Sequence, residues 1–410
     1  CWLDSPTAGT GFGTIAKNVL TALHNTGLYE IDQLAINYHG DFVNKNEVPW
    51  QLSPAKILDP KDPHGIKMFQ RCLQQNLYDI VWICNDLFVT HEVREFIPQV
   101  RAAYKNKNLK PPVFIYYYPV DCEVNAWATG LLDQCDIPVC YTTHSKFETV
   151  KTRPELIKKL RQIPHGVDTT SFYPLSKTEN DNTKKQLLNV DPSTTVVVQV
   201  NRNSTRKQIP YSFLAFKEFK KKVPNSIMYV HSQALDQGGD LKRAVESAGL
   251  SLKTDVVLPV NFNLANPLNT KQINAIYNMG DMFLTTHLGE GWGLTITEAM
   301  ACNVPVVAPR NTCMPEQLGE NSERGYLYEC KDSTYIDASG FRAKGLIPDI
   351  VDQMMLAYQD GNKFDNLKAK KAFEYAKSLD WSIVGKNWIS LFNEALTVRS
   401  NTKTSFVERI

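Results

Sequence analysis

Short apolar runs alternate with longer amphipathic stretches along the first half of the chain. The runs of strand length lie at residues 1–3, 31–36, 78–83, 113–118 and 138–141. Stretches of helix length, such as 14–24 and 90–100, separate them. Mostly apolar strands that alternate with helices are typical of a parallel sheet covered on both faces. The pattern therefore predicts an α/β domain.

A second series of the same kind begins near residue 194. Its expected strands are 194–200, 227–231, 255–258, 282–285, 304–308 and 325–328. Its expected helices are 210–222, 241–248, 271–278, 294–301 and 348–361. Doubly wound sheets bind ligands beyond the carboxyl ends of their strands. We therefore expect two Rossmann-like domains with a ligand-binding cleft between them.

The length of the chain sets the domain boundaries that we expect. A chain of 410 residues is too long for one ordinary core. We place the first domain at 1–175 and the second at 185–380. The polar run 176–184 is interpreted as the linker between them.

Composition and charge exclude several classes of protein. A hydrophobic content of 43% and a charged content of 21% are typical of a soluble globular protein, and the net charge of +2 does not call for a polyanionic partner. No apolar run approaches the length of a membrane span. The nine cysteines form no Cys-x-x-Cys pair and no zinc-like cluster. With no signal peptide pattern visible, we expect a reducing, cytoplasmic location.

The candidate chemistry is concentrated in residues 287–301, which read His-Leu-Gly-Glu-Gly-Trp-Gly-Leu-Thr-Ile-Thr-Glu-Ala-Met-Ala. An expected strand runs into this glycine-rich turn, and an expected helix follows it. Gly291 and Gly293 let main-chain N–H groups approach a ligand, and the helix N-terminus adds partial positive charge. Glu290 and Glu298 can then face one pocket. A carboxylate holds vicinal hydroxyls well, because it accepts two hydrogen bonds side by side.

This segment, with the Cys-Asn-Val-Pro-Val-Val-Ala that follows it, resembles the Glu-x7-Glu signature of GT-B-fold retaining glycosyltransferases of family 4 (glycosyl transferases group 1). The resemblance implies two Rossmann-like domains, a cleft between them, and a C-terminal helix, here 381–410, that packs back on the first domain. It implies that the first domain forms the acceptor side and the second the nucleotide-sugar donor side. It implies that Glu290 contacts the donor sugar near the reacting carbon and that Glu298 binds the ribose of the nucleotide. The other donor-binding residues expected here are Gly291, Trp292, Gly293, Leu294 and Thr295.

A second match lies at residues 201–207, Asn-Arg-Asn-Ser-Thr-Arg-Lys, after the first strand of the second domain. The family places an Arg and a later Lys here to neutralise the donor diphosphate. Arg202 and Lys207 fit these roles, and Arg206 is a rival for either. Fixed cations stabilise the negative charge that a leaving nucleoside diphosphate develops. The plain alternative is a basic, exposed loop.

The glycine-rich loop 7–14 gives a looser match in the first domain. Gly9, Gly11 and Gly13 have the spacing of neither a P-loop nor a dinucleotide-binding loop. The resemblance implies that Gly11 and Gly13 face the donor phosphates and the acceptor. The alternative is a tight turn without a ligand.

The segment 116–123 departs from the family's pattern. Family members often carry a His near this position, and this sequence offers Asp121, with no His nearby. Asp121 is therefore a catalytic candidate by position alone. A helix N-cap is the alternative.

The combined prediction is a metal-independent, retaining hexosyl- or pentosyltransferase. It would use a nucleotide diphosphate sugar of the UDP or GDP type as co-substrate and a hydroxyl acceptor: a glycan, a lipid-linked glycan or a hydroxymethylated DNA base. No Asp-x-Asp triplet is present to hold a divalent metal, so no metal or other cofactor is expected. No stable membrane insertion is expected, and the oligomeric state is left open.

The sequence is also compatible with three alternative functions. One is a sugar-nucleotide epimerase of the same fold. The second is an NAD-dependent oxidoreductase, which the glycine spacing disfavours. The third is a nucleotide-sugar-binding module without catalytic activity.

Overall fold

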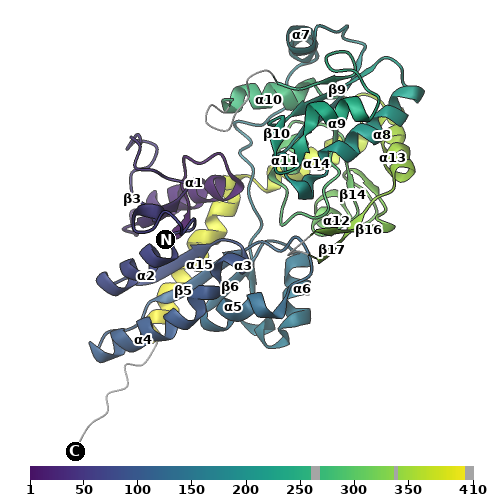
Figure 1. The fold of residues 1–410 in the computed structure, drawn as a ribbon. Coiled ribbons are helices and arrows are strands. Elements are labelled where there is room, and N and C mark those ends of the chain that lie inside the picture. The colour runs from purple at the N-terminus through teal and green to yellow at the C-terminus, as the bar shows by residue number, and fades with distance from the viewer. Residues whose placement is uncertain (260–267, 337–339, 402–410) are drawn as a thin grey trace, which may run out of the picture. The chain divides into compact units, whose positions relative to one another are not determined.

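The computed structural model describes residues 1–259, 268–336 and 340–401. The chain forms two compact units (Figure 1). Unit 1 comprises Cys1–Gly166 and Trp381–Ile410, and unit 2 comprises Val167–Asp380. Each unit has its own sheet and its own hydrophobic core.

The sheet of unit 1 has the strand order β3-β2-β1-β4-β5-β6-β7, and all its pairs are parallel. Its strands are β1 (Trp2–Asp4), β2 (Asp32–Ile36), β3 (Gln51–Pro54), β4 (Ile80–Cys84), β5 (Val113–Tyr118), β6 (Ile137–Cys140) and β7 (Arg161–Gln162). The strand order reverses between β1 and β4. Such a switch point is where doubly wound sheets bind ligands.

Helices cover both faces of this sheet. They are α1 (Gly11–His24), α2 (Ile66–Gln75), α3 (Leu87–Thr90), α4 (Phe96–Asn106), α5 (Gly130–Gln134), α6 (Thr143–Thr152) and α15 (Trp381–Asn401). Single turns of 3-10 helix add η1 (Ala55–Ile57), η2 (His91–Glu95), η3 (Ala126–Thr129) and η4 (Pro154–Lys158).

Strand β5 shows how the two faces are buried. Successive side chains of a strand point to opposite faces. Tyr116 and Tyr118 therefore join the core under α4 and α5, while Tyr117 faces the other way and meets Trp388 of α15 at 4.7 Å between ring centroids. All three tyrosines are fully buried. Polar and apolar residues do not alternate along β5, because both faces of this strand are covered.

Helix α15 belongs to unit 1 although it lies at the far end of the sequence. It packs against α1, β4 and β5 (Figure 1). Trp388 lies 5.2 Å from Trp82 of β4. Of the expected C-terminal helix, residues 402–410 lie outside the described part of the chain.

The main sheet of unit 2 has the order β12-β9-β8-β13-β14-β15 and is also parallel. Its strands are β8 (Thr195–Val200), β9 (Ser226–His231), β12 (Val256–Val257), β13 (Met282–Leu284), β14 (Val306–Pro309) and β15 (Tyr326–Tyr328). Here the order reverses between β8 and β13.

The helices of unit 2 are α7 (Lys177–Leu188), η5 (Thr205–Lys207), α8 (Ile209–Lys222), α9 (Leu241–Ser247), α10 (Thr270–Met279), α11 (Leu294–Ala301), α12 (Met314–Leu318), α13 (Ile347–Gln359) and α14 (Leu367–Ser378). Two antiparallel hairpins join β10 (Leu235–Asp236) to β11 (Gly239–Asp240) and β16 (Asp332–Ile336) to β17 (Gly340–Lys344). Two doubly wound parallel sheets confirm the expected α/β class.

The segment 176–184, interpreted above as the linker, forms most of helix α7 within unit 2. Ser176 and Glu179 make a reciprocal capping box at its start. This pairing satisfies main-chain N–H groups of the first turn, so a polar sequence is helical here. The chain passes between the units at 166–167 and 380–381.

These two connections run side by side. The Val167 N–H donates to the Leu379 carbonyl oxygen at 2.9 Å, and Thr169 N–H donates to Asp380 Oδ2 at 3.1 Å. A Cβ on Gly166 would lie 2.4 Å from the Trp381 ring, so only glycine fits there.

Along the described helices, no segment combines the length and the apolar character needed to cross a bilayer.

Candidate functional site

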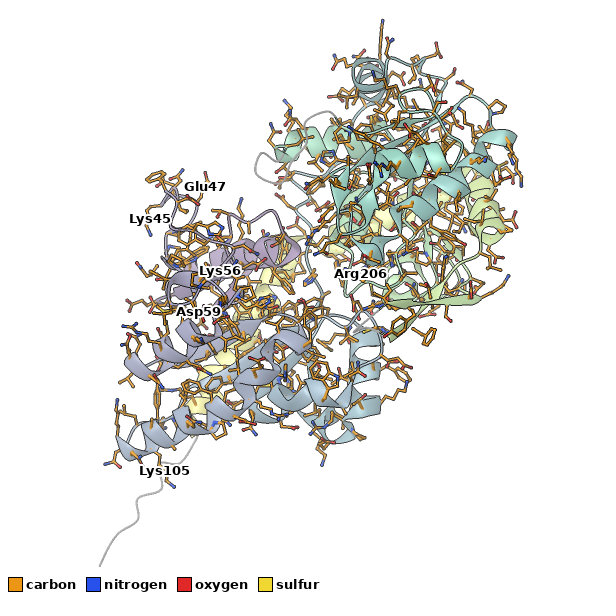
Figure 2. The ribbon with its side chains drawn as sticks, viewed as in Figure 1. Lys45, Glu47, Lys56, Asp59, Lys105 and Arg206 are labelled. Carbon is orange, nitrogen blue, oxygen red and sulfur yellow. The ribbon has the colours of Figure 1, made fainter. Side chains whose placement is uncertain are left out.

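The candidate site of unit 2 lies at the switch point of its sheet. Strands β8 and β13 are parallel neighbours, with Val198 paired to Phe283. The segments that follow them therefore leave the sheet at the same edge. Strand β8 leads into η5, which carries Arg206 (labelled in Figure 2) and Lys207, and β13 leads into the glycine-rich turn. Residues distant in sequence are thus brought together where such sheets bind ligands.

The Glu290 carboxylate is held between two cations. Lys207 Nζ donates to Glu290 Oε1, and Arg206 Nη1 lies 3.0 Å from Oε2. The Glu290 side chain is only 8% exposed. Burial raises the pKa of Glu290, but the charges of Arg206 and Lys207 lower it by more, so the net pKa lies well below its usual range. The carboxylate is therefore ionised at neutral pH.

Main-chain contacts fix the two segments to each other. The Leu288 N–H donates to the Arg206 carbonyl oxygen at 2.9 Å, and Thr286 Oγ1 donates to the Gln208 carbonyl oxygen at 2.9 Å. The Arg206 guanidinium also donates to the Gly289 carbonyl oxygen. The acid and its cations are therefore held by main-chain contacts as well as by their own charges.

The turn ends at a glycine with left-handed backbone geometry. Gly293 has a φ of +85° and caps α11, which begins at Leu294 as expected. A residue with a Cβ would be strained at this φ and would meet Ile296 Cδ1 at 2.8 Å. Leu294 and Thr295 are half-buried in the first turn of the helix. The first N–H groups of a helix have no acceptor within the helix, and such groups can donate to an anion.

Trp292 is enclosed within unit 2. Its side chain is buried, and its carbonyl oxygen accepts from Cys313 Sγ at 3.2 Å and from the Gln317 amide. Gly291, beside it, is buried as well. The Trp292 indole therefore supports the turn from inside.

Glu298 has a partner that the sequence did not indicate. Tyr277 of α10 donates its hydroxyl to Glu298 Oε2 at 2.6 Å. Burial raises the pKa of Glu298 to about 7, and the hydrogen bond from Tyr277 partly opposes this rise. Glu298 is half-buried, and it is not the solvated surface carboxylate that an ordinary helix position would give.

The three expected cations have different partners in the structure. Arg202 lies 54% exposed and donates through Nε to Asp236 Oδ2 at 2.9 Å. Arg206 and Lys207 contact Glu290 instead. Arg206, the alternative candidate, therefore lies beside Glu290. Arg202 is instead paired with Asp236 of the hairpin β10–β11.

In unit 1, the glycine-rich loop follows β1 and begins α1 at Gly11. Thr10 is the N-cap: its Oγ1 accepts from the Gly13 N–H at 3.0 Å and donates to Asp4 Oδ2 at 2.5 Å. A Cβ on Gly13 would lie 2.4 Å from the Ala8 carbonyl oxygen. Close packing of the loop alone therefore requires glycine at Gly13.

Asp121 lies half-buried in the irregular segment between β5 and η3. It interacts electrostatically with His144 in α6: burial lowers the pKa of His144, whereas the charges of Glu148 and Asp121 raise it. No His lies near Asp121 in sequence, but His144 interacts with it in the fold, because β5 and β6 are neighbouring strands that lead to the same edge. Nor does Asp121 cap a helix, since Asn125 precedes η3.

In residues 1–259, 268–336 and 340–401, no group of three or more His, Cys, Asp or Glu is arranged to hold a metal ion.

A comparison with known families matches the part of the chain that carries this site. Residues 180–338 match the family model described as Glycosyl transferases group 1. This range includes Arg202, Lys207, Glu290 and Glu298. The match bears out the resemblance seen in the sequence.

Curated relatives align with part of the chain. A probable sucrose-phosphate synthase of Thermosipho melanesiensis is 28% identical over 184 residues, which cover 45% of this chain and 40% of that protein. The alpha-monoglucosyldiacylglycerol synthase of Acholeplasma laidlawii is 27% identical over 146 residues, 35% of this chain and 34% of that one. The chain therefore matches less than half the length of these relatives.

Solved structures align with nearly the whole chain. The sucrose-phosphate synthase of Thermosynechococcus elongatus superposes with a TM-score of 0.68 at 15% identity, covering 97% of this chain and 96% of that one. Anabaena Alr3699/HepE, solved in complex with UDP-glucose, superposes with a TM-score of 0.68 at 14% identity, covering 95% and 98%. At this identity the likeness shows the fold, which is the GT-B architecture expected from the sequence.

Proposed function

We propose that this chain, whose residues 180–338 belong to the glycosyl transferases group 1 family, is a retaining glycosyltransferase that uses a UDP-type nucleotide sugar. The observation that carries the proposal is the ionised Glu290, held by Lys207 and Arg206 at the switch point of unit 2. A structural neighbour solved with UDP-glucose supports the choice of donor.

The cations and the helix terminus suit a diphosphate. Lys207, Arg202 and the N-terminal turn of α11 supply positive charge near the switch point. Preorganised charges of this kind stabilise a leaving group as its negative charge develops, because they need no reorganisation during the reaction. In this proposal they take the role that a divalent metal has in other transferases.

The two acids have different tasks in the proposed complex. Glu290 is ionised and fixed, so it accepts hydrogen bonds from hydroxyls of the donor sugar. Glu298 accepts from the ribose hydroxyls of the nucleotide, which replace or join the Tyr277 hydroxyl as its donors. In the proposed complex the donor is therefore bound on both sides of its diphosphate, at the sugar by Glu290 and at the ribose by Glu298.

The chemistry then requires positioning more than a strong base. With retention of configuration, the acceptor attacks the face from which the diphosphate leaves, and a phosphate oxygen accepts the hydroxyl proton of the acceptor. The bond between the anomeric carbon and the donor oxygen breaks as the new glycosidic bond forms. The protein contributes orientation and charge stabilisation. Exclusion of water limits hydrolysis of the donor.

The cysteines are the basis of the location that we propose. All nine cysteines lie in the described part of the chain and are free thiols. This state supports the proposal that the enzyme works in a reducing, cytoplasmic environment.

A donor panel tests the proposal. We expect UDP-glucose or another UDP-sugar to raise the unfolding temperature of the wild-type chain more than the GDP- and ADP-sugars do. The same donor should be cleaved slowly to UDP when no acceptor is present. If no nucleotide sugar binds and none is cleaved, the proposed function is wrong. Conversion of the donor into an epimeric sugar nucleotide would establish the epimerase in its place.

A further inference from the structure

Four aromatic side chains of unit 1 are more than half exposed: Phe42, Phe88, Trp127 and Phe147. Two of them, Phe88 and Trp127, come from separate segments that are linked in the structure. Phe88 of α3 is 60% exposed, and Trp127 of η3 is 54% exposed. The other six tryptophans, all within the described residues, are at most 9% exposed. A half-exposed tryptophan is therefore exceptional among the tryptophans of this chain, and exposed apolar side chains that are grouped together often mark a binding site.

The two segments are held together. The His91 ring meets the Trp127 ring edge-on, with 5.0 Å between centroids and 89° between planes. His91 Nδ1–H donates to the Phe88 carbonyl oxygen at 2.8 Å. His91 thus links Trp127 to the segment of Phe88. We call Phe88, His91 and Trp127 the aromatic platform.

The platform lies where unit 1 is built to receive a ligand. Helix α3 follows β4 and η3 follows β5, and these strands are neighbours in the sheet. Both segments therefore lie toward the carboxyl ends of the strands, and β4 borders the switch point beside β1. Doubly wound sheets bind ligands at this edge.

The charges around the platform select its ligand. Residues 85–95 and 121–129 together carry five carboxylates, from Asp86, Glu92, Glu95, Asp121 and Glu123, against one arginine, Arg94. Arg94 is paired with Glu95 at 3.5 Å, and Glu123 is paired with Lys151 at 3.4 Å. Arg153, whose Nη1 donates to Thr129 Oγ1 at 3.0 Å, is paired with Asp133 and Glu155. Carboxylates outnumber cations in these segments, and this negative balance disfavours an anionic lipid surface or a nucleic acid. Carboxylates that accept hydrogen bonds suit the hydroxyls of a neutral sugar.

We infer that the aromatic platform binds a neutral sugar ring of the acceptor, which stacks its C–H face on Trp127. The inference rests on the proposed function and names the acceptor class that it leaves open. The negative face of an aromatic ring attracts the weakly positive C–H groups of a pyranose. Apolar stacking surrounded by a few polar groups is the usual composition of a small-molecule site.

The single exposed tryptophan makes the test direct. Acrylamide quenches exposed indoles, so the quenchable fluorescence of the wild type reports mainly on Trp127. The probes are maltotetraose, cellotetraose, lactose and chitotetraose. We expect at least one of them to halve the quenching constant of the wild type, and to leave that of Trp127→Phe unchanged.

The control variant and the competing ligand complete the experiment. Phe147→Ala removes another exposed aromatic of unit 1, on α6, and should keep the sugar response. Vesicles of phosphatidylcholine with phosphatidylglycerol should give no response. Protection of Trp127 by vesicles, or by none of the four sugars, overturns the inference.

Binding of UDP-glucose to the wild type is measured separately by thermal shift. A chain that binds the donor but shows no sugar response refutes the platform alone. A chain that binds no nucleotide sugar refutes the proposed function.

Discussion

Lys207 donates a hydrogen bond to Glu290 across 83 positions of sequence. The contact exists because β8 and β13, which precede the two residues, are parallel neighbours at the switch point of one sheet. The Glu290 side chain is buried and that of Lys207 is 13% exposed. Arg206 contacts the other oxygen of the carboxylate. The pair therefore joins the two halves of the proposed donor site.

Replacing Lys207 should abolish most activity. We expect Lys207→Met to lower kcat/KM for the donor roughly 100-fold or more, because a fixed cation on the diphosphate is lost. The unfolding free energy should fall by about 1–3 kcal/mol, since Glu290 loses a charged partner. Release of UDP measures the first effect, and urea unfolding the second. Lys221→Met, which removes an exposed lysine from α8, is the control and should change neither. A kcat/KM within threefold of the wild type would remove Lys207 from the site.

The two arginines should differ in what they support. Arg202 is exposed and Arg206 packs beside Glu290, so Arg202→Ala should leave stability within about 0.5 kcal/mol of the wild type. Arg206→Ala should lower it by about 1–3 kcal/mol. If Arg202 contacts the diphosphate, Arg202→Ala lowers kcat roughly 100-fold. Equal kcat in Arg202→Ala and the wild type would assign the diphosphate to Arg206 and Lys207.

Glu298 should make donor affinity depend on pH. Its pKa is about 7, and ribose hydroxyls donate best to the ionised carboxylate. The affinity for UDP-glucose should therefore rise roughly tenfold per pH unit below pH 7 and level off above it. Calorimetry in buffers of different ionisation enthalpy should detect release of a proton on binding. The Glu298→Gln variant should bind more weakly and release none.

The same carboxyl also affects folding stability. Its pKa is higher in the folded state than the ordinary value of about 4.3, so the folded state binds more protons between these values. Its contribution to stability is therefore lost as the pH rises from about 4.3 to about 7. Glu298→Gln should remove this part of the pH dependence. A Gln variant with the same pH profile as the wild type would show that Glu298 ionises normally.

Gly13 and Gly9 provide a matched pair in the first loop. A Cβ on Gly13 would collide with the carbonyl oxygens of Ala8 and Ser5, whereas a Cβ on Gly9 would meet nothing within 4 Å. We expect Gly13→Ala to lower the unfolding free energy by about 1–3 kcal/mol and Gly9→Ala to leave it nearly unchanged. Urea unfolding of both variants measures the two unfolding free energies and tests this expectation. Equal stability would mean that the loop adapts without cost.

The parallel sheets were predictable because their strands are short and apolar between longer amphipathic stretches. Strand β5 and helix α11 lie where the sequence placed them. Helix α7 was missed because its polar sequence resembles a linker, although Ser176 and Glu179 carry a recognisable capping box. The hairpin β16–β17 was missed because its strands are largely exposed and have no buried face to set an apolar pattern.

Side-chain partners were the least predictable part of the site. The family motif identified Glu290, Glu298 and Lys207, but local sequence carries no information about which strand lies beside which. The contacts of Glu298 with Tyr277 and of Arg202 with Asp236 depend on packing between distant segments. His144 came near Asp121 for the same reason.

The position of α15 has a consequence for the order in which the protein is made. Unit 2 is one continuous stretch of chain, whereas unit 1 also needs α15, from which Trp388 packs on Trp82 and Tyr117. On the ribosome, every residue of unit 2 emerges before that tryptophan does. We therefore expect unit 1, most of which is synthesised first, to finish folding last, because one apolar face of its sheet stays uncovered until α15 has been synthesised.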